Sequence, residues 1–168
     1  FDPVVPGMQL PTAPRPLRYT RPAGVRRPER LEDVAYWPVT QLAELVRTRQ
    51  VMPSELVEMY LARLKRYDPQ LHAVVTLTEE RARAQAERLD RELRGGGYRG
   101  PLHGIPWGAK DLLATKGYTT TWGALPYREQ VLDYDAHVVE RLDAAGAVLV
   151  GALNMGEYAY DFTGENAH

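Results

Sequence analysis

The sequence predicts an α/β fold in which helices flank a sheet with parallel or mixed strand pairing. Apolar residues recur with helical spacing in several segments from residue 38 onward. The β-branched run HAVVTLT at 72–78 is typical of a strand. A predicted helix at 136–145 is closed by Gly146 and followed at once by the apolar run AVLVGAL. A helix that leads through a glycine into a buried strand is half of a crossover unit, which is why parallel or mixed pairing is expected.

Residues 1–37 precede these elements and are predicted to form an extended arm on the surface. They hold 7 of the 13 prolines, and six arginines fall between Arg15 and Arg30. Proline fixes φ and removes a backbone donor, so this stretch cannot form regular helix. An RNA-binding arm is the alternative, but no interleaved glycines or basic helix favour it. We divide the chain into this arm and one domain at 38–168.

Two helices are predicted at the start of the domain. The first places apolar residues at spacings of three and four, namely Val39, Leu42, Ala43 and Val46. The second begins at Pro53, which suits a first helical turn, and ends at Asp68-Pro69. Four of its residues share one face, namely Leu56, Met59, Tyr60 and Leu64. We interpret both apolar stripes as core.

Two further helices have predicted caps. Thr78 caps a helix that the glycines at 95–97 stop, and Asp135 caps the helix at 136–145. The buried stripe of the first of these helices consists of Ala82, Ala86, Leu89 and Leu93. Between them, GIPWGAKD at 104–111 is predicted to be a strand with a break, and LLATKGYTTTWG at 112–123 a turn-rich segment.

Lys110 is the residue for which a purely structural role is hardest to argue. Eighteen of the 21 basic residues are Arg, yet a Lys ends the uncharged run 100–109. A buried lysine can lose its proton and act as a base, which an arginine cannot. The alternative is a structural salt bridge to Asp111, although adjacent strand residues point to opposite faces. Spacing alone leaves both interpretations open.

Other chemistry-bearing residues are sparse. The chain has no cysteine, and its four histidines show no metal-ligand spacing. Its one serine, Ser54, stands at a helix start, where a structural role is expected, and His103 is interpreted as a loop histidine that holds backbone groups. The run TTTW, which comprises Thr119, Thr120, Thr121 and Trp122, is either a strand edge or part of a pocket wall. The net charge of −1 gives no overall argument for a nucleic-acid partner.

Four motifs together resemble the amidase signature family. These are GIPWGAKD, TKGYTTTWG, DAHVVERLDAAGAVLVGALNMGEYAY and TGEN, in the family's order and spacing from about Pro38 to His168. They correspond to the part of the family's fold that precedes its glycine- and serine-rich signature loop. The resemblance implies a central twisted mixed sheet flanked by helices, of which this chain holds a part.

The resemblance also implies an activity, namely hydrolysis of a linear carboxamide by a nucleophilic Ser, a bridging Ser and a Lys. The family's lysine corresponds to Lys110, and neutral Lys110 would draw a proton through the bridging serine from the nucleophile. Burial of the strand is expected to keep Lys110 neutral. Both serines are expected beyond residue 168, so this chain supplies only the lysine. Thr119 to Trp122 are expected to line part of the substrate pocket.

The implied partners are a small-molecule amide and the remainder of the same enzyme, with no metal, cofactor, nucleic acid or membrane, and a homodimer is left open. Leu112-Leu113 stand where amidotransferase A-type subunits usually have Asn-Ile, and Trp107 and Gly108 where many relatives have small aliphatic residues. A free-standing amidase is therefore favoured over such a subunit, which would act on a tRNA-bound substrate. A non-catalytic binding fragment is the remaining alternative. No apolar run could span a bilayer, so a soluble protein is expected, cytoplasmic by default with export left open.

Overall fold

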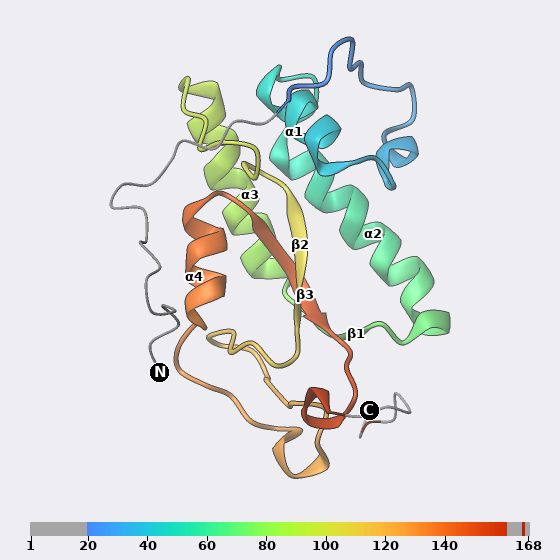
Figure 1. The fold of residues 1–168 in the computed structure, drawn as a ribbon, viewed down its shortest axis with the longest axis vertical. Coiled ribbons are helices and arrows are strands. Elements are labelled where there is room, and N and C mark those ends of the chain that lie inside the picture. The colour runs from blue at the N-terminus through green and yellow to red at the C-terminus, as the bar shows by residue number, and fades with distance from the viewer. Residues whose placement is uncertain (1–19, 161–165, 167–168) are drawn as a thin grey trace, which may run out of the picture.

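The computed structural model describes residues 20–160 and Asn166, and it has the α/β architecture that the sequence predicts (Figure 1). The regular elements, in chain order, are α1 Val39–Arg47, α2 Pro53–Leu71, β1 Val74–Leu77, α3 Glu79–Arg94, β2 Pro106–Lys110, α4 His137–Ala144 and β3 Val148–Leu153. Short 3₁₀ helices occur at Leu31–Val34, Leu125–Tyr127 and Glu157–Ala159.

The described strands form a mixed three-stranded sheet in the order β1-β3-β2. The central strand β3 runs antiparallel to β1 and parallel to β2, which confirms the predicted mixed pairing. The register of β2 shifts between Trp107 and Gly108, within the segment 104–111 that is predicted to be a strand with a break. Gly151 allows β1 to approach β3, because a Cβ there would lie 2.9 Å from the carbonyl oxygen of Thr76.

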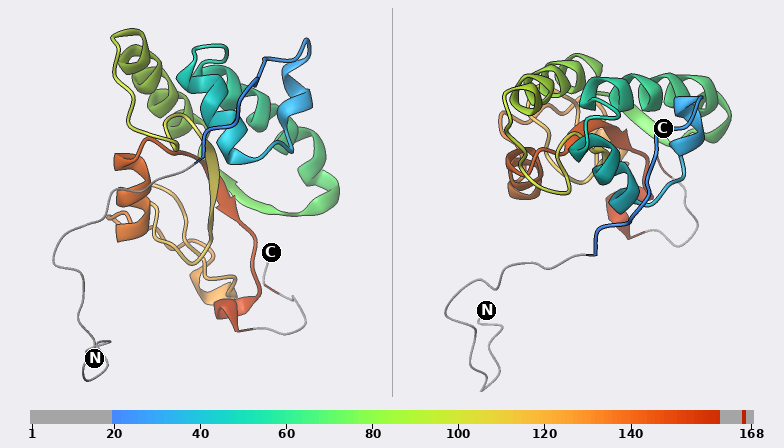
Figure 2. Two further views of the ribbon diagram at one scale, coloured as in Figure 1. Left: turned by 45° about the horizontal axis from the view of Figure 1, so that its top comes forward. Right: turned by 90° about the horizontal axis from the view of Figure 1, so that it is seen from above.

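Helices cover both faces of this sheet, and the alternation of side chains along β3 shows how. Val148 and Val150 pack against α2 and α3, and Leu149 packs on the opposite face with Val139 of α4. Figure 2 shows α2 and α3 side by side. The strand is therefore buried on both faces, as its uninterrupted apolar run predicts.

A second part of the core joins the segment before α1 to the rest of the molecule. Val34 is fully buried in a cluster with residues of α1, α2 and the loop before β2. Val25, Leu31 and Trp37 pack against this cluster. Residues 1–19 of the predicted arm lie outside the described residues, and the division of the chain at residue 38 remains a prediction.

The predicted end and inner face of α2 need correction. The helix continues through Pro69 to Leu71, because a proline this near a helix end removes a single hydrogen bond. It ends where His72 adopts the left-handed conformation, with φ of 48°. Its fully buried residues are Pro53, Leu56, Val57 and Leu61, whereas Met59, Tyr60 and Leu64 are only partly covered.

Both predicted side-chain caps are also wrong. Thr78 does stand at the N-terminal cap position of α3, but its buried hydroxyl donates to the carbonyl of Leu149 at 2.8 Å. Asp135 lies one residue before the cap position of α4, which Ala136 occupies. Its carboxylate accepts two hydrogen bonds from Arg81 of α3 instead. In both places the side chain expected to cap a helix forms its hydrogen bonds with a residue distant in sequence.

Candidate active site

The candidate site lies where the two parallel strands end. Strands β2 and β3 run in the same direction, so their carboxyl ends meet at one edge of the sheet, a common position for ligand sites in α/β proteins. Lys110 is the last residue of β2 and pairs with Leu153, the last residue of β3. The loops that follow the two strands, 111–135 and 154–160, lie together below this edge in Figure 1.

Lys110 is exposed at this edge, contrary to the expectation that its strand buries it. The reason is its position, since it is the final strand residue and alternates with Ala109 and Asp111, both of which are buried. Within the described part of the chain, its ammonium group makes no hydrogen bond or ion pair. It is therefore not a structural partner of Asp111 here, and its catalytic role remains a prediction.

Asp111 holds the following loop against the sheet. Its side chain is 1% exposed, and its carboxylate accepts the backbone N–H of Thr121 at 3.1 Å and the Thr121 hydroxyl. Its own N–H donates to the carbonyl of Leu153 at 3.0 Å, and its carbonyl accepts the N–H of Trp122 at 3.1 Å. One residue thus connects the ends of both strands to the threonine-rich loop.

The four predicted pocket residues are at this edge and differ in burial and partners. The Thr119 hydroxyl lies 3.0 Å from that of Thr76, and Thr119 bridges to Val131 in a short antiparallel pairing, as a strand edge would. Thr120 and Thr121 are buried, and the Thr120 hydroxyl has no partner among the described residues. Trp122 is partly exposed at φ of 55°, with its ring 4.8 Å from that of Tyr127. Their contact with a substrate remains a prediction.

Gly123 allows a close contact between the loop after β2 and the chain after β3. A Cβ on it would lie 2.9 Å from the carbonyl oxygen of Met155, so the loop after β2 packs tightly on the chain after β3. The N–H of Tyr158 donates to the carbonyl of Trp122 at 2.7 Å across the same contact.

Two asparagines at this edge are missed by reasoning from the sequence. Asn154, directly after β3, donates to the carbonyl of His72 at 2.7 Å. Its side-chain oxygen accepts from Met155 N–H at 2.8 Å and from the Asn166 amide at 2.5 Å. Both asparagines stand in motifs that carry the resemblance, which is the only signal that points to them. The rest of the TGEN motif, 163–165, lies outside the described residues.

Ser54 and His103 have structural roles, as expected, and neither belongs to this edge. The Ser54 N–H and hydroxyl both donate to the carboxylate of Asp90, which is 4% exposed. His103 is fully buried between two backbone groups, with Nδ1 accepting from Arg99 N–H and Nε2 3.1 Å from the carbonyl of Leu89. Only a neutral ring with its proton on Nε2 satisfies both, and burial lowers the pKa of His103 accordingly.

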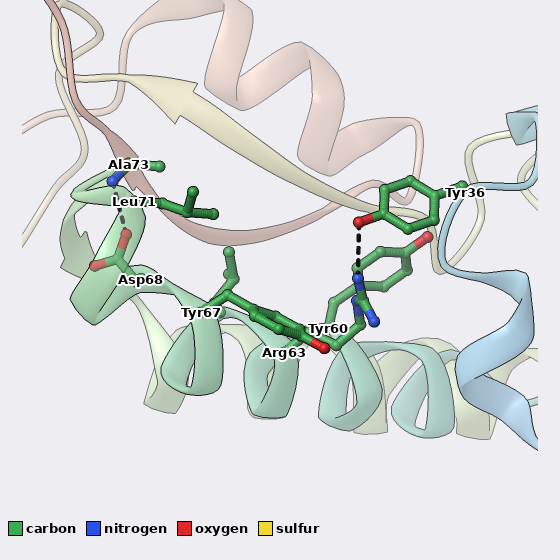
Figure 3. A pocket seen from close by; sticks show the side chains of 8 residues that line it. Tyr36, Tyr60, Arg63, Tyr67, Asp68, Leu71 and Ala73 are labelled. Atoms are coloured by element: carbon green, nitrogen blue, oxygen red, sulfur yellow. Dashed lines mark hydrogen bonds between the residues drawn. The ribbon is translucent and has the colours of Figure 1, made fainter.

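A separate cavity of about 460 Å³ lies beside α2 (Figure 3). Tyr36, Tyr60 and Tyr67 line it, together with Arg63, whose guanidinium group lies over the rings of Tyr36 and Tyr67 at 5.2 and 5.1 Å. None of the predicted site residues contributes to it. The cation already covers two of the aromatic faces, so we interpret the cluster as packing around Arg63.

Metal-ligating side chains do not cluster in the described structure. Among residues 20–160 and Asn166, no group of three or more His, Asp or Glu side chains is placed to hold an ion. The helices in the same part of the chain include none that is long and apolar enough to cross a membrane.

Comparison with known proteins places these features in a family. The Amidase family model matches residues 55–168. The Mycobacterium tuberculosis protein AmiD, which is named as an amidase, is 42% identical over 135 residues, or 79% of this chain and 28% of that protein. The A-type subunit of the glutamyl-tRNA(Gln) amidotransferase from Methylococcus capsulatus is 42% identical over 130 residues, or 77% of this chain and 27% of that protein.

Solved structures agree in fold. The native peptide amidase of Stenotrophomonas maltophilia superposes with a TM-score of 0.72 at 36% identity, covering 77% of this chain and 27% of that enzyme. The chain thus spans little more than a quarter of the length of the relatives it matches.

Proposed function

The chain belongs to the amidase family, and from that premise we propose that it contributes the lysine of an active site that hydrolyses the C–N bond of a linear carboxamide. The observation that carries this proposal is the position of Lys110. It ends β2 beside the end of β3, projects to the exposed side, and is not committed to an ion pair within the described residues.

Lys110 would act as a base. A neutral lysine takes the proton of a bridging serine, which takes the proton of the nucleophilic serine as that oxygen attacks the carbonyl carbon. Collapse of the resulting intermediate breaks the C–N bond, the proton passes to the leaving nitrogen, and water then hydrolyses the acyl-serine. Preorganised backbone N–H groups would stabilise the oxyanion.

The serines of this scheme must come from outside the 168 residues. Ser54 is the one serine in the sequence, and its hydroxyl is engaged with Asp90. A lysine base also needs removal from water to lose its proton near neutral pH. Since Lys110 is exposed here, the proposal includes that further protein covers this edge of the sheet in the working enzyme.

An amidotransferase A-type subunit is the second candidate function. The 42% identity to the Methylococcus protein favours it as much as the equal identity to AmiD favours a free-standing amidase. Leu112 and Leu113, which replace the usual Asn-Ile of these subunits, favour the amidase. Under this second candidate, the substrate would be bound to tRNA and partner subunits would be required.

The test is an activity assay of the complete enzyme that carries these residues. We expect release of ammonia or an amine from a simple carboxamide, such as an aryl amide, without any partner subunit. Ammonia transfer to a tRNA-bound acyl group that depends on partner subunits would favour the second candidate. If the enzyme shows neither reaction, the proposed function is wrong.

A further inference from the structure

We infer that Asp111 is a positioning residue, whose buried carboxylate fixes both the direction of Lys110 and the place of the 119–123 loop at the edge of the sheet. The inference rests on the proposed function only where it concerns catalysis. The anchoring of the loop follows from contacts within the described structure.

The direction of Lys110 is determined by its neighbour. Lys110 and Asp111 are consecutive at the end of an extended strand, so their side chains leave on opposite sides. Asp111 is 1% exposed and its carboxylate is bonded to Thr121. As long as this carboxylate stays buried, Lys110 must face outward. Because one backbone carries both side chains, a rotation of the chain that releases Asp111 would also change the direction of Lys110.

The same carboxylate determines the conformation of the loop. Thr121 donates its N–H and its hydroxyl to Asp111, and the Thr121 hydroxyl oxygen accepts the N–H of Gly123 at 3.1 Å. Between them, Trp122 is held at φ of 55°, a left-handed conformation that a tryptophan rarely adopts without such constraints. The Asp111 side chain is therefore the acceptor around which this turn is built.

A buried carboxylate can stabilise the fold without any influence on an active site. Asp90 provides the comparison with Asp111. Asp90 is 4% exposed and accepts the N–H and the hydroxyl of Ser54, just as Asp111 accepts both groups of Thr121. Asp90 lies on α3, and its hydrogen bonds within the described residues go to Ser54 at the start of α2 and to Arg94 of α3. Loss of either carboxylate removes the bonds from an N–H and a hydroxyl of one residue, and for Asp90 also the ion pair with Arg94 at 3.5 Å, but only Asp111 is covalently next to the proposed base.

The experiment compares Asp111→Asn with Asp90→Asn in the complete enzyme. The amide keeps the shape of the carboxylate but replaces one acceptor oxygen with an NH2 donor. The N–H of Thr121 bonds to both carboxylate oxygens, so it loses one of these bonds and faces a donor instead. For Asp111→Asn we expect hydrogen exchange across 119–123 at least about tenfold faster. We also expect a fall in kcat of roughly 10- to 100-fold with a change in KM of less than about threefold, because a displaced base slows the chemical step rather than binding. Asp90→Asn should lose stability while kcat of the folded protein stays within about twofold of the parent value.

A second pair of variants keeps the inference testable if Asp111→Asn does not fold. Thr121→Ser retains both donors and should keep the slow hydrogen exchange across 119–123. Thr121→Val loses the hydroxyl and should reproduce part of the rise in exchange and part of the fall in kcat. The inference is overturned if Asp111→Asn, or Thr121→Val in its place, is folded and matches Asp90→Asn in exchange and kcat. It is also overturned if exchange rises while kcat is unchanged in an enzyme that needs Lys110. If Lys110→Met retains full kcat, the proposed function fails, and the exchange data alone then decide whether Asp111 anchors the loop.

Discussion

Arg81 on α3 and Asp135, two residues before α4, form a two-bond ion pair across 54 positions of sequence. Nη1 and Nη2 donate to the two carboxylate oxygens at 2.8 and 2.7 Å, and the side chains are 18% and 21% exposed. The same carboxylate accepts the N–H of Lys116 at 2.8 Å. The pair therefore fastens the long loop after β2 to a helix of the core, on the path between Lys110 and α4.

The first prediction concerns this pair. Arg81→Met should lower the free energy of unfolding by about 1–3 kcal/mol, because it leaves a partly buried carboxylate without its charged donors. Arg83→Met is the control, since Arg83 pairs with Glu58 and Glu79 at the surface with its own side chain about half exposed, and it should cost less than Arg81→Met. Denaturant unfolding of both variants measures this. Equal losses would mean that the Arg81–Asp135 pair stabilises the fold no more than an exposed ion pair does.

The pH dependence of the same variant follows from the carboxylate. Hydrogen bonds from Arg81 hold the pKa of Asp135 below its ordinary 3.8, so the pair stabilises the fold above that pH. This stabilisation is lost as the pH falls through the lowered pKa. The difference in stability between parent and Arg81→Met should therefore shrink on acidification below about pH 4. A difference that is constant from pH 7 to pH 2 would contradict the ion pair as its source.

His103 should make the fold sensitive to mild acid. Burial lowers its pKa in the folded state, so the unfolded chain binds the proton more readily. Stability should therefore fall as the pH drops below the ordinary histidine value of about 6.5, until the lowered pKa is reached. The measurement is the denaturation midpoint from pH 8 to pH 5, with His137→Gln as the exposed control. His103→Gln should abolish this part of the pH dependence; its persistence would assign the effect to another group.

Gly104 should tolerate no side chain. Its φ is 77°, and a Cβ would lie 2.5 Å from Cγ of Pro53 at the start of α2. Gly96 serves as the control for backbone strain without a clash. Its φ is 90°, and a Cβ added there would have no atom within 4 Å. Gly96→Ala should cost about 1–2 kcal/mol, and Gly104→Ala a further 1–3 kcal/mol or so for overpacking. Thermal unfolding compares the two, and equal costs would show that Pro53 moves aside freely.

Ser54 should be dispensable for chemistry. Ser54→Ala removes one hydrogen bond to Asp90 and should destabilise the fold by about 1–3 kcal/mol. The kcat of the complete enzyme should stay unchanged, since the proposed nucleophile lies elsewhere. Steady-state kinetics at a temperature where the variant is folded measures this. A loss of kcat of more than about 10²-fold would make Ser54 a candidate nucleophile instead.

The elements of this fold could be predicted where local pattern and tertiary packing agree. The spacing of Leu42 and Val46 gives α1, and the apolar run at 148–153 gives β3, because the residues that produce each pattern are the ones that are buried. The caps at Thr78 and Asp135 could not be predicted in the same way. A cap rule weighs only neighbours in sequence, whereas Leu149 and Arg81 compete for those side chains from a distance.

The candidate site was predictable in part for a similar reason. Strand alternation indicates that Lys110 and Asp111 do not pair, and the structure agrees. The same alternation does not say which of the two is covered, since that depends on Thr121, ten residues later. The hydrogen bond between Asn154 and Asn166 leaves no periodic pattern in the sequence. Only the resemblance of the surrounding motifs indicated these two residues.

The most direct test of the account is the kcat of Lys110→Arg in the complete enzyme, measured from pH 6 to pH 9 on a simple carboxamide. Arginine keeps the charge and most of the stem but cannot give up its proton, so a base is lost while a charge is retained. We expect kcat to fall at least about 10²-fold, with Lys110→Met equally impaired and both variants folded by circular dichroism. Near-normal kcat for folded Lys110→Arg across this range would show that Lys110 is not the base, and would contradict the proposed function.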